Sequence, residues 1–114
     1  MRILLLFFTF LLVSCTPSPS DGTQSSAKTP TSTAARGRTI YQTQCIACHN
    51  SDPKKLGALG PEVFGSSKEL LSARILKGDY PPGYTPKRTT RTMAPLPHLK
   101  NEIDSIYLFL NAAE

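Results

Sequence analysis

Two cysteines and a histidine stand together in the segment Cys45-Ile46-Ala47-Cys48-His49. Two thiols three positions apart, at the end of a helix and before a tight turn, can each form a thioether with one vinyl group of the same porphyrin. The adjacent imidazole then lies under the iron. The spacing therefore predicts covalent attachment of one haem through Cys45 and Cys48, with His49 as the proximal iron ligand.

Two other chemistries use the same residue types. A thiol oxidoreductase also has a C-x-x-C pair, but it places the pair after a strand in a βαβ unit, and no such strand pattern surrounds Cys45. A structural zinc site needs four ligands, and the chain beyond the first 15 residues offers Cys45, Cys48, His49 and the distant His98 as its Cys and His residues. The thiol alternative predicts free thiols and no haem.

The residues before the motif form a helical pattern. Gly37, Tyr41 and Cys45 are four positions apart and share one face of a helix predicted from Ala34 to Gln44. A glycine inside a helix costs about 1 kcal/mol relative to alanine, which indicates close packing against another helix. With the C-x-x-C-H motif, this pattern resembles the class I c-type cytochromes, whose first helix carries Gly-x-x-x-aromatic and packs against the last helix. The resemblance implies that Phe109 faces the first helix.

The resemblance extends beyond the motif. Residues 60–65, Gly-Pro-Glu-Val-Phe-Gly, are similar to the Gly-Pro-x-Leu-x-Gly stretch that follows the haem motif in this family. By that resemblance the carbonyl of Pro61 accepts a hydrogen bond from Nδ1 of His49, which fixes the tautomer and strengthens Nε2 as an iron ligand. The alternative is a plain proline turn.

A second axial ligand is needed if the iron is to transfer electrons without binding small molecules. Met93 and His98 are the candidates beyond His49. Residues 92–97, Thr-Met-Ala-Pro-Leu-Pro, resemble the Met-Pro loops that ligate iron in the family, although here Ala94 separates Met93 from the proline. A thioether ligand favours Fe(II) and raises the reduction potential. Met93 is the preferred ligand and His98 the alternative.

Two further helices are predicted. Residues 66–69, Ser-Ser-Lys-Glu, form a capping-box pattern that opens a helix ending at Gly78, and a last helix begins at residues 101–104. The prediction is an all-α domain over residues 36–114 with the cytochrome c fold, in which three main helices and long loops surround one covalently attached haem. In the turn-rich loop between the second and last helices, five residues could contact the haem propionates or an acidic partner: Tyr80, Tyr84, Lys87, Arg88 and Arg91.

The N-terminal residues 1–14 predict an export signal. Arg2 supplies the positive start and Ile3 to Val13 are apolar except for Thr9. This stretch is too short to span a bilayer, which takes about 20 residues of helix. Residues 12–15, Leu-Val-Ser-Cys, resemble the lipobox of bacterial lipoproteins, which implies cleavage before Cys15 and acylation of its thiol. An ordinary signal peptide with a chance cysteine is the alternative.

The stretch after this cysteine differs in composition from the rest of the chain. Residues 16–35 contain no aromatic and no large aliphatic residue, so they cannot bury enough surface to offset their ordering entropy. We therefore predict a flexible linker over residues 15–35 that tethers the domain to the periplasmic side of a bacterial membrane.

Length, charge and ligation together suggest the function. A chain of 114 residues is too short for most multi-domain enzymes. Its net charge of +5 favours redox partners with acidic docking surfaces. A basic chain could also bind nucleic acid, but the predicted export argues against a nucleic-acid partner. With both axial positions filled, the prediction is an electron carrier between membrane or periplasmic redox partners and not an enzyme. The alternatives are the haem c subunit of a larger dehydrogenase or oxidase, and a sensor with an open sixth position.

Overall fold

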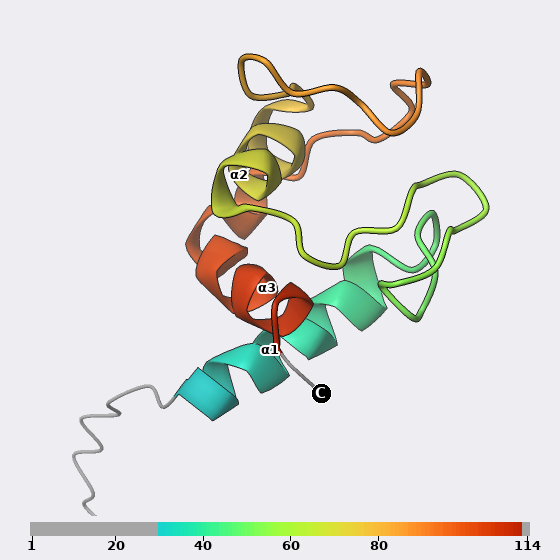
Figure 1. Ribbon diagram of the computed structural model, residues 1–114. Coiled ribbons are helices and arrows are strands. Elements are labelled where there is room, and N and C mark those ends of the chain that lie inside the picture. The colour runs from blue at the N-terminus through green and yellow to red at the C-terminus, as the bar shows by residue number, and fades with distance from the viewer. Residues whose placement is uncertain (1–29, 113–114) are drawn as a thin grey trace, which may run out of the picture.

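The computed structural model describes residues 30–112, which are helical with connecting loops (Figure 1). Helix α1 spans Pro30–Gln44, α2 spans Lys68–Lys77 and α3 spans Ile103–Leu110, and a 3-10 helix, η1, spans Pro97–Glu102 just before α3. Because residues 30–112 contain no strand, the all-α prediction is confirmed. Within the same range, no helix has the length and apolar character needed to cross a membrane. The predicted signal segment, residues 1–14, and Cys15 lie outside the described residues.

Helix α1 begins earlier than the sequence predicts. It starts at Pro30, and a proline in the first helical turn removes only an N–H that has no helical partner. Thr33, Gly37 and Tyr41 are all buried, and their spacing of four places them on one face. The predicted linker, residues 15–35, is therefore wrong for residues 30–35. Their side chains are small, but Thr33 extends the buried face of the helix.

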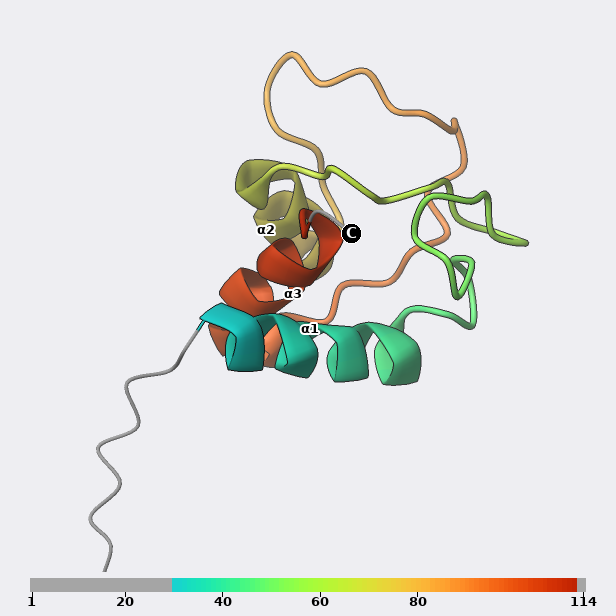
Figure 2. The same cartoon turned by 60° about the horizontal axis from the view of Figure 1, so that its bottom comes forward.

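The first and last helices pack closely, and they lie against each other in both Figure 1 and Figure 2. A Cβ added to Gly37 would lie only 1.8 Å from the backbone oxygen of Ser105 on α3. One turn further on, the rings of Tyr41 and Phe109 have centroids 5.4 Å apart and an interplanar angle of 49°. The predicted contact between these helices, including the position of Phe109, is confirmed.

Helix α2 has a cap at each end. Ser67 is the N-cap, and its side chain accepts a hydrogen bond from the backbone N–H of Leu70. The predicted capping box is therefore wrong by one residue, because the hydroxyl of Ser66 donates to the carbonyl of Val63 instead. Gly78 has a φ of 70° and ends the helix as predicted.

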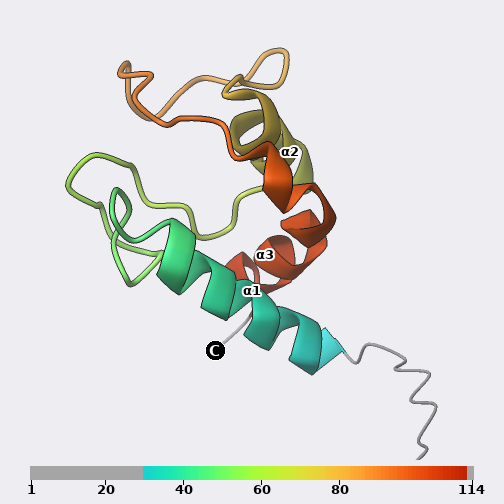
Figure 3. The same ribbon diagram turned by 180° about the vertical axis from the view of Figure 1, so that it is seen from behind.

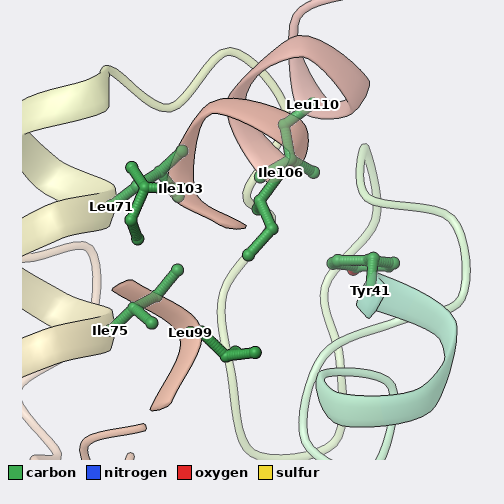
Figure 4. Close-up of a cluster of buried hydrophobic side chains, with 7 residues drawn as sticks. All are labelled: Tyr41, Leu71, Ile75, Leu99, Ile103, Ile106 and Leu110. Carbon is green, nitrogen blue, oxygen red and sulfur yellow. The ribbon is translucent and has the colours of Figure 1, made fainter. Parts of the chain in front are cut away.

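The last helix begins at Ile103, slightly later than predicted, because Pro97–Glu102 adopt the tighter 3-10 conformation that often precedes an α-helix. The buried apolar side chains come from all four helices (Figure 4): Tyr41, Leu71, Ile75, Leu99, Ile103, Ile106 and Leu110. In the close-up, Tyr41 stands apart from Leu71 and Ile75, and these three side chains line the same cavity. The core thus forms one wall of a site.

Candidate cofactor site

A cavity of about 600 Å³ lies between the core and the loops that connect the helices. This is the size of many small-molecule and cofactor sites, which measure about 300–1,000 Å³. All five residues predicted to bind the cofactor line it: Cys45, Cys48, His49, Pro61 and Met93. His98, the alternative to Met93, is exposed on η1 and is not among the lining residues. The structure thus brings Met93, and not His98, to the cavity that contains His49.

The cysteine motif continues the end of α1 as a tight turn. The N–H of Cys45 donates to the carbonyl of Tyr41, and the N–H groups of Cys48 and His49 both donate to the carbonyl of Cys45, at 3.1 and 2.9 Å. Both cysteines are partly buried and are not joined in a disulfide. The turn therefore presents two thiols and an imidazole to one cavity, as the spacing predicts.

The environment of Cys45 does not suit thiol exchange. Burial raises the pKa of this thiol from 9.0 to about 11, and the neighbouring Cys48 adds to the shift. Disulfide exchange requires a thiolate, and reactive cysteines have lowered pKa values. In addition, residues 30–112 contain no strand from which a βαβ unit could be built. Both observations disfavour the thiol oxidoreductase alternative.

The imidazole of His49 is held in a fixed orientation. Its Nδ1 lies 2.8 Å from the carbonyl oxygen of Pro61, so a proton on Nδ1 leaves Nε2 as the free lone pair for a metal. A Cβ on Gly60 would lie 2.4 Å from Cε1 of the ring, so that only a glycine lets the backbone approach this closely. His49 can therefore serve as an oriented metal ligand through Nε2.

Residues 57–62, called the 57–62 segment below, fold back onto the motif. The N–H groups of Leu59 and Gly60 donate to the carbonyl of Cys48, at 3.1 and 2.9 Å. The N–H of Gly57 donates to the carbonyl of Gly60, and a Cβ on Gly57 would meet the backbone of Cys48 and His49. These contacts fix the carbonyl of Pro61 relative to the imidazole.

A second wall is polar and basic. Residues 79–92, called the 79–92 loop below, contribute four of the five residues predicted to contact propionates, namely Tyr80, Tyr84, Lys87 and Arg88. Arg91, the fifth, is not among the lining residues. From behind (Figure 3), this loop and the loop that follows α1 lie on the same side of the molecule.

Arg74 is a site residue that we did not predict from the sequence. It lines the cavity from α2, donates a hydrogen bond to the carbonyl of Gly78, and places its guanidinium 4.4 Å from the centroid of the Tyr80 ring. Its position three residues after Leu71 puts it on the cavity face of α2, and this spacing is a signal that could have identified it.

The donor set suits a metal that brings its own equatorial ligands. Within residues 30–112, no three His, Cys, Asp or Glu side chains come together to hold an ion, whereas a closed zinc site needs four ligands. Haem iron takes axial ligands from the protein, typically one histidine with a methionine or a second histidine. His49 and Met93, one residue of each type, both line the cavity.

Comparisons with models of protein families, with curated proteins and with solved structures found no match to this chain.

Proposed function

We propose that this chain is a mono-haem c-type cytochrome that carries one electron at a time between redox partners. The observation that carries the proposal is the convergence of Cys45, Cys48, His49 and Met93 on one cavity, with Nδ1 of His49 bound to the carbonyl of Pro61. Two thiols, an oriented imidazole and a thioether form the donor set that covalent haem requires. The helical arrangement would then be the cytochrome c fold.

Each residue of the site has a role under this proposal. Cys45 and Cys48 would hold the cofactor in the cavity through two thioether bonds, each formed by addition of one S–H group across a vinyl group. His49 would hold the iron through Nε2, while the carbonyl of Pro61 keeps the proton on Nδ1. Met93 would hold the iron through its thioether, a ligand that favours the reduced state. The haem, when bound, supplies an Fe(II)/Fe(III) couple.

The polar wall supports the same assignment. Arg74, Lys87 and Arg88 bring positive charge to the cavity, and Tyr80 and Tyr84 bring hydroxyl groups. Such groups are suited to bind the two carboxylates of a haem through charge-assisted hydrogen bonds. Core residues such as Leu71 and Ile75 also line the cavity and would keep water away from a bound haem.

The setting of the protein is also a proposal. Export, acylation of Cys15 and tethering through the linker would place the domain on the periplasmic side of a bacterial membrane. Cleavage before Cys15 would remove Arg2 and leave a net charge of +4, which favours partners with acidic docking surfaces. With both axial positions filled, the protein leaves no open coordination position for a substrate, so we propose a carrier and not an enzyme.

The test compares Met93→Ala with His98→Ala in the full chain, expressed with haem-attachment machinery. The wild type and His98→Ala should show a sulfur-to-iron charge-transfer band when oxidised and should bind carbon monoxide slowly when reduced. Met93→Ala should lose the band, bind carbon monoxide rapidly and have a lower reduction potential. Rapid binding by the wild type would indicate a sensor with an open sixth position. A wild type that lacks the band, and that binds carbon monoxide rapidly after His98→Ala but not after Met93→Ala, would overturn the ligand assignment.

A further inference from the structure

The 57–62 segment orients His49, and three of its carbonyl groups accept hydrogen bonds from two cationic side chains. The guanidinium of Arg88 donates through Nη2 to the carbonyl of Gly57 and through Nη1 to that of Leu59, both at 3.3 Å. Nζ of Lys87 donates to the carbonyl of Glu62 at 3.3 Å and lies 2.9 Å from its carboxylate. Lys87 and Arg88 therefore form hydrogen bonds to the 57–62 segment both before and after Gly60 and Pro61.

The two cations belong to the loop that leads to Met93. At its start, this 79–92 loop is fixed to α2, because Arg74 lies over the ring of Tyr80 and Tyr80 stacks on Tyr84 with centroids 5.4 Å apart. Beyond Met93, the N–H of Leu96 donates to a carbonyl of α2. The loop is thus held at both ends, and Lys87 and Arg88 connect its middle to the 57–62 segment.

We propose that Lys87 and Arg88 are positioning residues that couple the segment orienting His49 to the loop presenting Met93. The inference rests on the proposed function, in which His49 and Met93 would both hold one iron. Hydrogen bonds from charged donors are stronger than neutral ones, so the two cations limit the opening of the 79–92 loop and thereby the dissociation of Met93. The same bonds keep the carbonyl of Pro61 against Nδ1 of His49.

The test uses Arg88→Gln in the haem-loaded full chain, with Arg91→Gln as the matched control. Arg91 lies on the same loop, is exposed, and has its guanidinium 6.0 Å from the Tyr80 ring centroid. Both variants lose one positive charge. Hydrogen exchange of the Leu59 and Gly60 amides reports on the 57–62 segment, and the rate of carbon monoxide binding to the reduced protein reports on Met93.

Arg88→Gln removes both hydrogen bonds of the guanidinium, and because each is long, at 3.3 Å, we count the two together as one charged hydrogen bond of ordinary strength. Both processes should therefore accelerate by about tenfold. Exchange of the Ile106 amide on α3 should be unchanged, and Arg91→Gln should match the wild type in all three measurements. Arg88→Lys keeps the charge and can reach one carbonyl, so it should give an intermediate result. Lys87→Gln provides a second variant, which should accelerate the same two processes.

Two results would overturn the inference while leaving the proposed function intact. The first is a haem-loaded Arg88→Gln protein that behaves like Arg91→Gln. The second is acceleration of Ile106 exchange to the same extent as that of Leu59 and Gly60, which would indicate general destabilisation. If the wild type itself carries no haem, the proposed function fails and this inference fails with it.

Discussion

Gly37 allows α1 and α3 to approach closely, and replacing it with alanine tests this contact. The added Cβ would lie 1.8 Å from the carbonyl oxygen and 2.4 Å from the carbonyl carbon of Ser105. Both atoms belong to the backbone of α3, so no side-chain rotation can relieve the overlap. The two helices must move apart, and the packed rings of Tyr41 and Phe109 lie one turn away.

Two effects of opposite sign determine the magnitude. Alanine in place of glycine favours a helix by about 1 kcal/mol, whereas overpacking a core commonly costs about 1–3 kcal/mol and sometimes more. Because the overlap is with backbone, we take the upper end of that range, which leaves a net loss of about 2 kcal/mol. In a domain of this size, that loss lowers the melting temperature by roughly 8–16 °C.

The assay is thermal or urea denaturation of the haem-loaded protein followed by circular dichroism. Ala35→Gly on the exposed face of α1 is the control, because it changes helix propensity by about 1 kcal/mol without touching α3. Gly37→Ala should be less stable than the wild type although its helix propensity is higher. A variant more stable than the wild type would refute the close approach of the two helices.

Two further substitutions test the surroundings of the motif. Gly60→Ala would place a methyl group 2.4 Å from Cε1 of His49 and separate Nδ1 from the carbonyl of Pro61. The imidazole would then be a weaker electron donor, so the reduction potential measured by potentiometric titration should rise. Pro61→Ala keeps the backbone carbonyl and is the control; equal potentials for the two variants would contradict this reasoning. Tyr41→Phe removes the 2.6 Å hydrogen bond to the carbonyl of Asn50 and should cost about 1 kcal/mol in urea denaturation at neutral pH. Because burial raises the pKa of Tyr41 from 10.0 to about 12, the unfolded chain ionises first, and wild-type stability should fall as the pH rises from 10 towards 12. The phenylalanine variant should lack that part of the fall, and an identical pH dependence would show that Tyr41 is not the group responsible.

Local sequence patterns predicted much of the fold. A glycine and an aromatic residue four positions apart placed Gly37 and Tyr41 on one buried face, and both contact α3. Gly78 marked the end of α2 because glycine readily adopts the left-handed conformation found there. The Cys-x-x-Cys-His spacing defined one side of the candidate site within five residues of the chain.

Other features depend on contacts between distant segments, and the sequence did not reveal them. The first turn of α1 lacks large apolar residues, so the burial of Thr33 follows from packing in the folded domain. Two adjacent serines could each cap α2, and the choice of Ser67 follows from the bond that Ser66 makes to Val63. Likewise, Arg88 donates hydrogen bonds to carbonyl groups about 30 positions earlier in the chain. Because every residue has a backbone carbonyl, the sequence does not indicate which of them bind Arg88.

The mass and visible spectrum of the purified full chain test the central claim most directly. We expect a coloured protein whose mass, measured under denaturing conditions, includes one haem that is lost when Cys45 and Cys48 are both replaced by serine. A colourless wild-type protein, with a mass that lacks the haem and with two thiols open to alkylation in the domain, would contradict the proposed function.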